Sequence, residues 1–291
     1  MTLDFVVFHQ SKPTIILAII LAVATVAALL PGDDAALDKH VHRLYHEDFE
    51  SYQSDADLWV RGGPYLNQWR KTVPAGGAVR LVRDQFRKSG RAAVELLQAG
   101  DADSAYSNAI LYYRVPLSTV QPHGRLGISG WISVENLADA RLFFLNELWT
   151  GRKKPIKEHF GHREALLAGG IQYNSRTRRW QWEHGGGDSP YSDFSDPIEI
   201  EEGLDRFHFF KLVVDYDTGR YVSFQFDKQI WDLSPHKHMV FEPDVSHDPT
   251  PAMFELNVRL ITYDDYEGRY RCRAIVDDVE ITAIGIQAGP R

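Results

Sequence analysis

The sequence predicts an all-β protein, a two-sheet antiparallel β-sandwich that follows one N-terminal hydrophobic helix. Short stretches rich in aromatic and β-branched residues recur along the chain, separated by Gly, Pro, Asn and Asp, as in strands joined by turns. Long helical patterns are scarce, and this combination favours a sandwich. The 291 residues are 44% hydrophobic and 25% charged, an ordinary globular composition that excludes a disordered, collagenous or multi-span membrane protein.

The N-terminal segment carries an uncharged apolar run from 14 to 30. This length is the short limit for a membrane-spanning helix and is long for the core of a signal peptide. Lys12 precedes the run and Asp33 and Asp34 follow it, so the positive-inside rule places the rest of the chain outside the cytoplasm. We expect residues 1–32 to be a signal peptide or a membrane anchor, with a linker over 33–42.

The region from 43 to 286 is predicted to form the sandwich domain, with a tail at 287–291. Its predicted strands cover 92–97, 109–115, 127–134, 142–148, 170–173, 180–183, 209–215, 221–226, 254–262 and 272–281. The best helix candidate, 156–167, could equally be a loop.

The clearest local motif is a hairpin over 209–226, with Gly219 at the expected positive-φ position of its turn. Strand alternation predicts two faces, Val222, Phe224 and Phe226 on one and Tyr221, Ser223 and Gln225 on the other. A second tight turn at 227–229 leads into a strand-like stretch at 230–233.

This hairpin and the two ends of the domain carry a family resemblance. KLVVDYDTGRYVSFQFDKQIWDL at 211–233 resembles the strand–turn–strand of concanavalin-A-like and laminin-G-like jelly rolls. YHEDFES at 45–51, followed by Trp59, and IVDDVEIT at 275–282 are similar to the opening and closing strands of carbohydrate-binding modules. The resemblance implies a jelly roll whose first and last strands pair, in domains that bind glycans or accompany enzymes. Fold alone does not assign an activity.

The resemblance also implies a structural calcium site. If the end strands pair, Glu47 and Phe49 share one apolar face, and Ile275, Asp277, Val279 and Ile281 share another. Similar modules hold calcium near such a sandwich edge, and the oxygens of Glu47 and Asp277 suit this ion. The alternative is that the two carboxylates accept hydrogen bonds from backbone amides or pair with an arginine.

An aromatic platform is the first candidate for a ligand site. Trp180 and Trp182 alternate, so both indoles share one strand face, and Tyr173 lies across the preceding turn. Asp188 and Tyr191 follow in a Gly-rich loop. Exposed flat aromatics stack on pyranose rings, whereas the competing interpretation buries the indoles in the core. Solvent exposure distinguishes the two.

A basic segment at 146–163 is the second candidate, in a chain of formal charge −8. It includes Trp149 and Arg152, and it suits a uronate polymer or a phosphorylated glycan unless it is simply a solvated loop. The acidic balance of the whole chain argues against a nucleic-acid partner.

No catalytic residue is predicted. The acid pairs Glu199/Glu201 and Asp278/Glu280 have the spacing that glycoside hydrolysis requires, but Glu199 and Glu201 alternate with isoleucines as on a polar outer face. The His-x-His pairs at 40–42 and 236–238 lack a recognisable third metal ligand. Cys272, the single cysteine, excludes an intramolecular disulfide and fits a structural thiol.

The sequence therefore predicts a non-catalytic glycan-binding domain outside the cytoplasm, secreted or tethered through residues 1–32. Its expected partners are poly- or oligosaccharides, together with the membrane if that segment is retained. One alternative is a polysaccharide lyase or glycoside hydrolase with an unrecognised site. The other is a structural cell-surface protein that contacts another protein.

Overall fold

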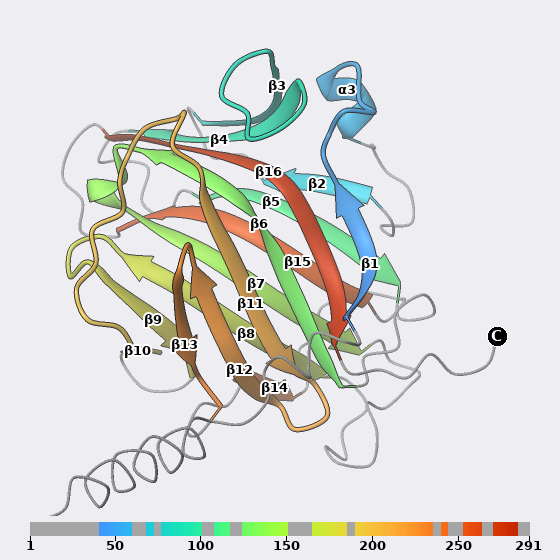
Figure 1. Ribbon diagram of the computed structural model, residues 1–291, viewed down its shortest axis with the longest axis vertical. Coiled ribbons are helices and arrows are strands. Elements are labelled where there is room, and N and C mark those ends of the chain that lie inside the picture. Colours follow the sequence, from blue (N-terminus) through green and yellow to red (C-terminus); the bar gives the residue numbers. More distant parts are fainter. Residues whose placement is uncertain are drawn as a thin grey trace, which may run out of the picture. The chain divides into compact units, whose positions relative to one another are not determined.

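Two antiparallel sheets stack face to face in the computed structural model (Figure 1). It describes residues 41–59, 68–72, 77–100, 108–116, 124–150, 165–184, 190–234, 240–243, 253–263 and 270–284. Sheet A, in spatial order, contains β13 (Gln229–Asp232), β12 (Arg220–Phe226), β11 (His208–Asp215), β6 (Arg125–Glu135), β16 (Tyr270–Ile284), β4 (Ala92–Gly100) and β3 (Ala78–Arg83), with β1 (Val41–Glu47) also paired to β16. Sheet B contains β10 (Tyr191–Asp193), β9 (Arg179–Glu183), β8 (Ala165–Asn174), β7 (Ala140–Thr150), β15 (Met253–Thr262), β5 (Asn108–Pro116) and β2 (Gln68–Thr72), with β14 (Val240–Pro243) also paired to β8.

The two-sheet sandwich predicted from the sequence is confirmed, and each predicted strand lies within an observed one. The described helices are short, α3 (Asp55–Leu58), whose first turn Ser54 caps, and η2 (Leu137–Asp139). Residues 165–167, the end of the helix candidate, belong to β8 instead. The apolar run at 14–30 lies outside the described residues, and no helix within them is long and apolar enough to cross a membrane.

The core lies between the sheets and is rich in aromatic side chains. Alternate residues of each strand point inward, so Phe144 of β7 stacks on Phe210 of β11 with ring centroids 4.1 Å apart. Trp180 of β9 is 0% exposed, and its ring centroid lies 4.7 Å from that of Phe224 and 4.8 Å from that of Phe226, both on β12. These contacts between sheets hold the sandwich together.

A β-bulge changes which residues of β12 face the core. Val213 pairs with Ser223, but the next residue of β11, Val214, pairs with Tyr221, so Val222 is the extra residue. Tyr221 is therefore fully buried on the same side as Phe224, whereas Val222 is only half-buried. The expected division of this strand into faces is wrong at these two positions.

The first and last described strands pair, as the resemblance implied. Glu47 of β1 lies opposite Val279 of β16. β16 is an interior strand of sheet A, with β6 on one side. On the other side it pairs first with β4 and then, further along, with β1. The sandwich is thus closed by its own two ends.

A second bulge lies in the middle of β16. Asp278 has a left-handed backbone (φ 49°), and the register with β6 shifts between Asp277 and Glu280. Val279 belongs to the core, but Ile275 packs in a separate cluster outside sheet A, and Asp277 shares that outward side. The prediction that Ile275, Asp277 and Val279 share one face is therefore wrong.

Candidate functional site

The predicted aromatic platform lies mostly in the core. Tyr173 is 3% exposed and Trp180 is 0% exposed, so neither ring is available for stacking on a sugar. Trp182 shares the inward side of β9, as the alternation predicted, and its half-buried indole packs edge-to-face against Tyr221 at 5.8 Å. Strand alternation correctly placed the two indoles on the same side of β9, but that side faces the core.

The outward side of the same strands carries polar groups instead. Arg179, Gln181 and Glu183 alternate along β9, and the register places Tyr191 opposite Glu183 and Asp193 opposite Gln181. All five are half-buried or exposed. We call these five residues the β9–β10 margin. Tyr191, which the sequence nominated, is its aromatic member.

Hydrogen bonds fix the polar groups of the margin. Gln181 Nε2 donates to Asp193 Oδ1 at 2.7 Å, and Gln172 Nε2 donates to Gln181 Oε1 at 2.6 Å. Arg179 donates to the Ser195 carbonyl at 3.1 Å and lies 3.6 Å from Asp193 Oδ2. Because each amide is oriented by its neighbour, the surface is organised before any ligand arrives.

A glycine makes room for the carboxylate of Glu183. A Cβ at Gly170 would lie 2.5 Å from Glu183 Oε2 and 3.0 Å from Leu145 and Phe143. Phe143 also meets the ring of Tyr191 edge-to-face at 5.7 Å. The small residue therefore allows the acidic and aromatic members of the margin to lie against sheet B.

The middle of this outward face is closed. Four of its side chains are at most 3% exposed, namely Phe143, Leu145, Gln172 and Asn257. The β9–β10 margin, in contrast to these four side chains, is half-buried or exposed.

Two other nominated ligand residues, Asp188 and Arg152, lie outside the described residues. For Trp149 the structure gives only a strand position in β7, opposite Met253. Among the acids, Glu199 and Glu201 are exposed and each forms an ion pair with an arginine, Arg178 and Arg206 respectively. Cys272 is buried, in accord with a structural thiol.

Sequence reasoning missed one pair of acids. Glu147 of β7 and Glu255 of β15 are direct register partners on two neighbouring strands in the interior of sheet B. Directly opposed Cα atoms in antiparallel strands lie about 4.5–5.5 Å apart. No local motif could reveal this pair, because strand register alone brings the two residues together.

The carboxylate of Glu47, the first of the two predicted calcium ligands, is surrounded by hydrogen-bond donors. Its Oε1 accepts from Phe49 N at 2.8 Å, and its Oε2 accepts from Tyr45 Oη at 2.8 Å, Tyr52 Oη at 3.0 Å and Trp69 Nε1 at 3.3 Å. Burial, together with the Glu47 charge, raises the pKa of both tyrosine hydroxyls, so they keep their protons. The groups around this carboxylate therefore point hydrogen atoms at it, and not the oxygen lone pairs that a shared calcium ion would need.

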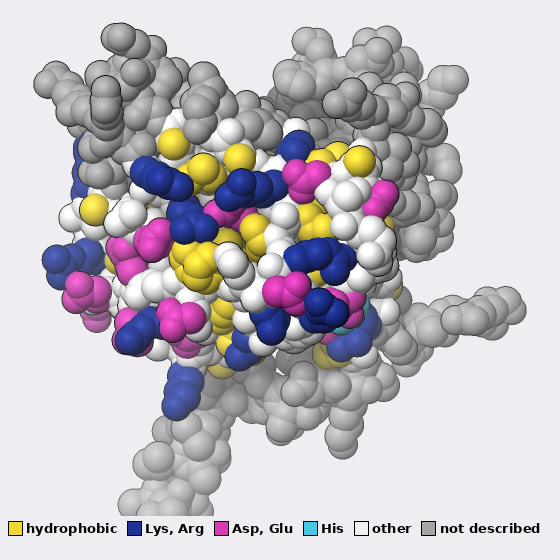
Figure 2. Space-filling view, turned by 90° about the horizontal axis from the view of Figure 1, so that it is seen from above, with side chains coloured by type: hydrophobic (Ala, Val, Ile, Leu, Met, Phe, Trp, Pro, Cys, Tyr) yellow, Lys and Arg dark blue, Asp and Glu magenta, His cyan; other side chains and the backbone are white. Residues whose placement is uncertain are grey.

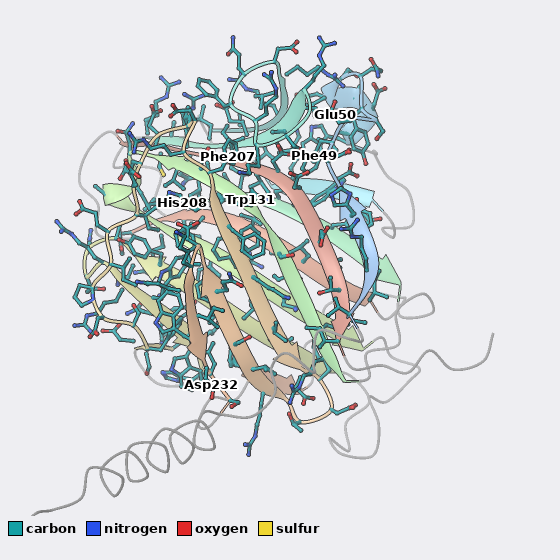
Figure 3. The ribbon with its side chains drawn as sticks, viewed as in Figure 1. Phe49, Glu50, Trp131, Phe207, His208 and Asp232 are labelled. Carbon is teal, nitrogen blue, oxygen red and sulfur yellow. The ribbon has the colours of Figure 1, made fainter. Side chains whose placement is uncertain are left out.

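Asp277, the other nominated ligand, is on the opposite side of sheet A. It lies opposite Trp131, which is on the outward face of the sheet (Figure 3). Its Oδ2 accepts from Lys88 N at 2.9 Å and Ser89 N at 3.1 Å, and its Oδ1 accepts from Asp278 N at 2.8 Å. Glu47 and Asp277 therefore do not meet as a calcium pair. Within the described residues, no group of three or more His, Cys, Asp and Glu is placed to hold a metal.

The buried position of Asp277 predicts a pH effect on stability. Burial, and secondarily the Asp278 charge, raises the pKa of Asp277 to about 6, although three backbone N–H groups oppose the rise. The unfolded value is near 3.9, so the folded state holds the proton more tightly. This stabilising contribution is complete below about pH 4 and is lost as the pH rises through about 6.

In the parent protein, the free energy of unfolding should fall by about 1–3 kcal/mol as the pH rises through about 6. We expect Asp277→Asn, which has no carboxyl group at this position, to lack this fall. Urea denaturation of both proteins from pH 4 to 8 measures it. Parallel stability profiles would contradict the assignment.

Comparisons with known proteins yield likenesses of structure alone. No family model and no curated protein matches the chain. The chain is similar to a carbohydrate esterase from the Shiga toxin-encoding bacteriophage phi24B, at 14% identity over 84% of this chain and 99% of that one, with a TM-score of 0.44. It is also similar to the GH131 β-glucanase catalytic domain from Podospora anserina, at 14% identity over 86% and 97% of the chains, with a TM-score of 0.42. A third, TmCBM61 in complex with β-1,4-galactotriose, has 10% identity over 75% and 90%, with a TM-score of 0.32. At this level of similarity they assign no activity to this chain.

Proposed function

We propose that this chain is a glycan-binding domain and that its β9–β10 margin contacts the sugar. The observation that supports this is the margin itself, where a guanidinium, an amide, two carboxylates and a phenol ring lie side by side in fixed register. Amide and carboxylate groups exchange hydrogen bonds with neighbouring hydroxyls, and the phenol ring offers an apolar surface to the C–H groups of a pyranose.

A glycan array followed by calorimetry on the full chain tests this proposal. We expect Gln181→Ala to weaken binding of the best array glycan by about tenfold, because it removes the group that links Gln172 to Asp193. The matched control is Gln225→Ala, which removes a half-buried glutamine of sheet A. Equal affinities for the two variants, or an array without any retained glycan, would contradict the proposal. The latter result would favour a structural surface protein.

A second candidate function is glycoside hydrolysis at Glu147 and Glu255. Catalysis by two carboxylates requires groups about 5 to 10 Å apart, and Glu147 and Glu255 occupy directly paired positions on neighbouring strands. Product analysis of the array glycans distinguishes binding from turnover. If the parent protein releases reducing ends and neither Glu147→Gln nor Glu255→Gln does, hydrolysis would replace binding as the proposed function.

We also retain as a proposal that the domain acts outside the cytoplasm, secreted or tethered through residues 1–32. The support is the charge asymmetry around the apolar run in the sequence.

A further inference from the structure

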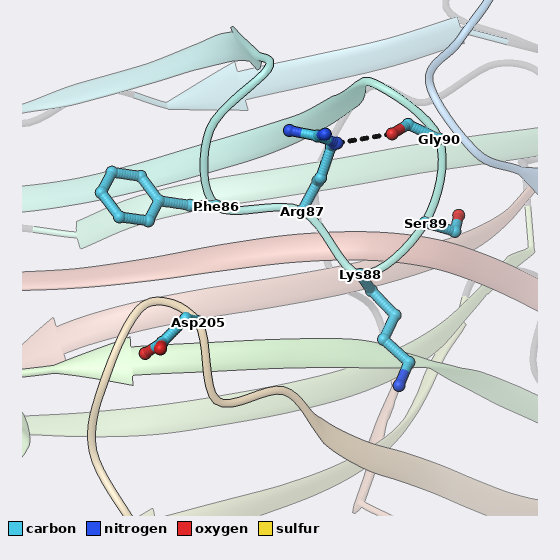
Figure 4. Close-up of a pocket in the computed structure, with 6 residues that line it drawn as sticks. All are labelled: Phe86, Arg87, Lys88, Ser89, Gly90 and Asp205. Carbon is cyan, nitrogen blue, oxygen red and sulfur yellow. Dashed lines mark hydrogen bonds between the residues drawn. The ribbon is translucent and has the colours of Figure 1, made fainter.

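A separate pocket lies outside sheet A, between the turn that joins β3 to β4 and the loop that carries Asp205 (Figure 4). Its volume is about 370 Å³, and it is lined by Phe86, Arg87, Lys88, Ser89 and Gly90 of the turn and by Asp205. In Figure 4 the turn curves over the sheet and Asp205 faces it from a neighbouring loop. Seen from above, this end of the domain shows Lys and Arg interspersed with Asp and Glu around hydrophobic side chains (Figure 2). A pocket of this size accommodates a small ligand such as one or two sugar units.

The turn is held in shape by acids beneath it. Asp277 accepts the N–H groups of Lys88 and Ser89, and Glu50 Oε1 accepts that of Ala92 at 2.7 Å. Phe86 (φ 49°) and Gly90 (φ 51°) both have left-handed backbones. This conformation is unfavourable for a phenylalanine, so the surrounding hydrogen bonds impose it. The pocket is therefore a formed feature of the fold.

Two of the residues lining the pocket are cations without a carboxylate partner. Two described arginines near this turn form ion pairs, Arg91 with Asp84 at 2.9 Å and Arg273 with Glu95 at 2.6 Å. Among the described residues, neither Arg87 nor Lys88 forms an ion pair with a carboxylate, although the charge of Arg87, after that of Arg91, lowers the pKa of nearby Asp84. Arg87 Nε donates to the Gly90 carbonyl, and the Lys88 ammonium lies 3.8 Å from the ring centroid of Trp131. Adjacent exposed cations in an acidic protein favour an anionic ligand.

The remaining lining groups suit a ligand that is also polyhydroxylated. Phe86 is 37% exposed, one of the few large hydrophobic side chains at the described surface, and it offers an apolar ring beside the cations. Asp205 adds a carboxylate that accepts hydrogen bonds from hydroxyls. A simple inorganic anion would use neither group.

We propose that this pocket binds an acidic sugar unit, a uronate, whose carboxylate is attracted by the positive charge of Arg87 and Lys88 and whose ring contacts Phe86 and Asp205. The choice of a sugar rests on the proposed function, whereas the anionic character of the ligand rests on the pocket alone.

Calorimetry of the full chain with a galacturonate trimer, a neutral galactose trimer and inorganic sulfate tests the proposal. We expect the uronate trimer to bind the pocket and Arg87→Gln and Lys88→Gln each to weaken it by about tenfold. Lys88→Arg should retain binding. Arg220→Gln, which removes an exposed cation at the other end of the β11–β12 hairpin, should leave it unchanged. Thermal melts of each variant confirm that it is folded.

Three outcomes would overturn the proposal. Unchanged uronate affinity in the Arg87→Gln, Lys88→Gln double variant would exclude the site. Sulfate that binds as tightly as the uronate would leave a general anion site and exclude the sugar, and a neutral trimer that binds the pocket equally well would exclude the role of the cations. Gln181→Ala should leave uronate binding at the pocket intact, so failure here and failure of the β9–β10 margin are separate results.

Discussion

Trp180→Ala should lower the free energy of unfolding by about 3–5 kcal/mol. The indole is 0% exposed and is surrounded by rings of both sheets, with Tyr173 at 5.2 Å and Phe224 at 4.7 Å. Its removal leaves a cavity between the sheets that these rigid rings cannot fill. Urea denaturation measures the loss, and glycan retention should disappear together with folding.

Trp182→Ala is the matched comparison, because this half-buried indole lies on the same strand and the same side. We expect a smaller loss, about 1–2 kcal/mol. If Trp180→Ala instead kept the stability of the parent protein and lost only glycan binding, the ring would be a ligand contact and its place in the core would be wrong.

Glu47→Ala should cost about 3–5 kcal/mol of unfolding free energy. The substitution leaves the Phe49 amide and two tyrosine hydroxyls without their shared acceptor in a nearly closed site, whereas the Trp69 indole N–H keeps its bond to Tyr45 Oη at 2.9 Å. Glu47→Gln keeps one acceptor oxygen but turns an amide towards donors, so its loss should be intermediate. Chemical denaturation of the three proteins ranks them.

The hydrogen bonds of the Glu47 carboxylate also lead to a prediction about metal binding. Because its oxygens already accept hydrogen bonds, we expect EDTA to leave the melting temperature of the parent protein unchanged. A melting temperature that falls with EDTA and returns with added calcium would support the predicted calcium site at Glu47 or Asp277.

Much of the fold could be predicted because strand composition and turns are local properties. The hairpin turn illustrates this, since Gly219 has the positive φ (64°) that its position required. Alternation also showed correctly that Trp180 and Trp182 share a face. It could not show which face is inner, because this depends on how the second sheet packs against β9.

The two bulges explain the remaining errors in the prediction. An extra residue at Val222 or at Asp278 reverses the alternation beyond it, and neither position carries the glycine that would have signalled an unusual backbone. The β9–β10 margin was partly visible, through Tyr191. Strand alternation places Gln181 and Glu183 on the side away from the two indoles, and this side is the one that is not in the core.

The position of β16 has a consequence for how the chain acquires its structure during synthesis. Strand β16, which lies between β6 and β4 in sheet A, is the last of the described strands to leave the ribosome, so β4 and β6 each keep an unpaired edge until it is made. Pairing across so much intervening sequence has a high contact order and makes folding slow. Until that strand arrives, the nascent domain exposes edges open to pairing with other chains, which makes protection by chaperones valuable at this stage.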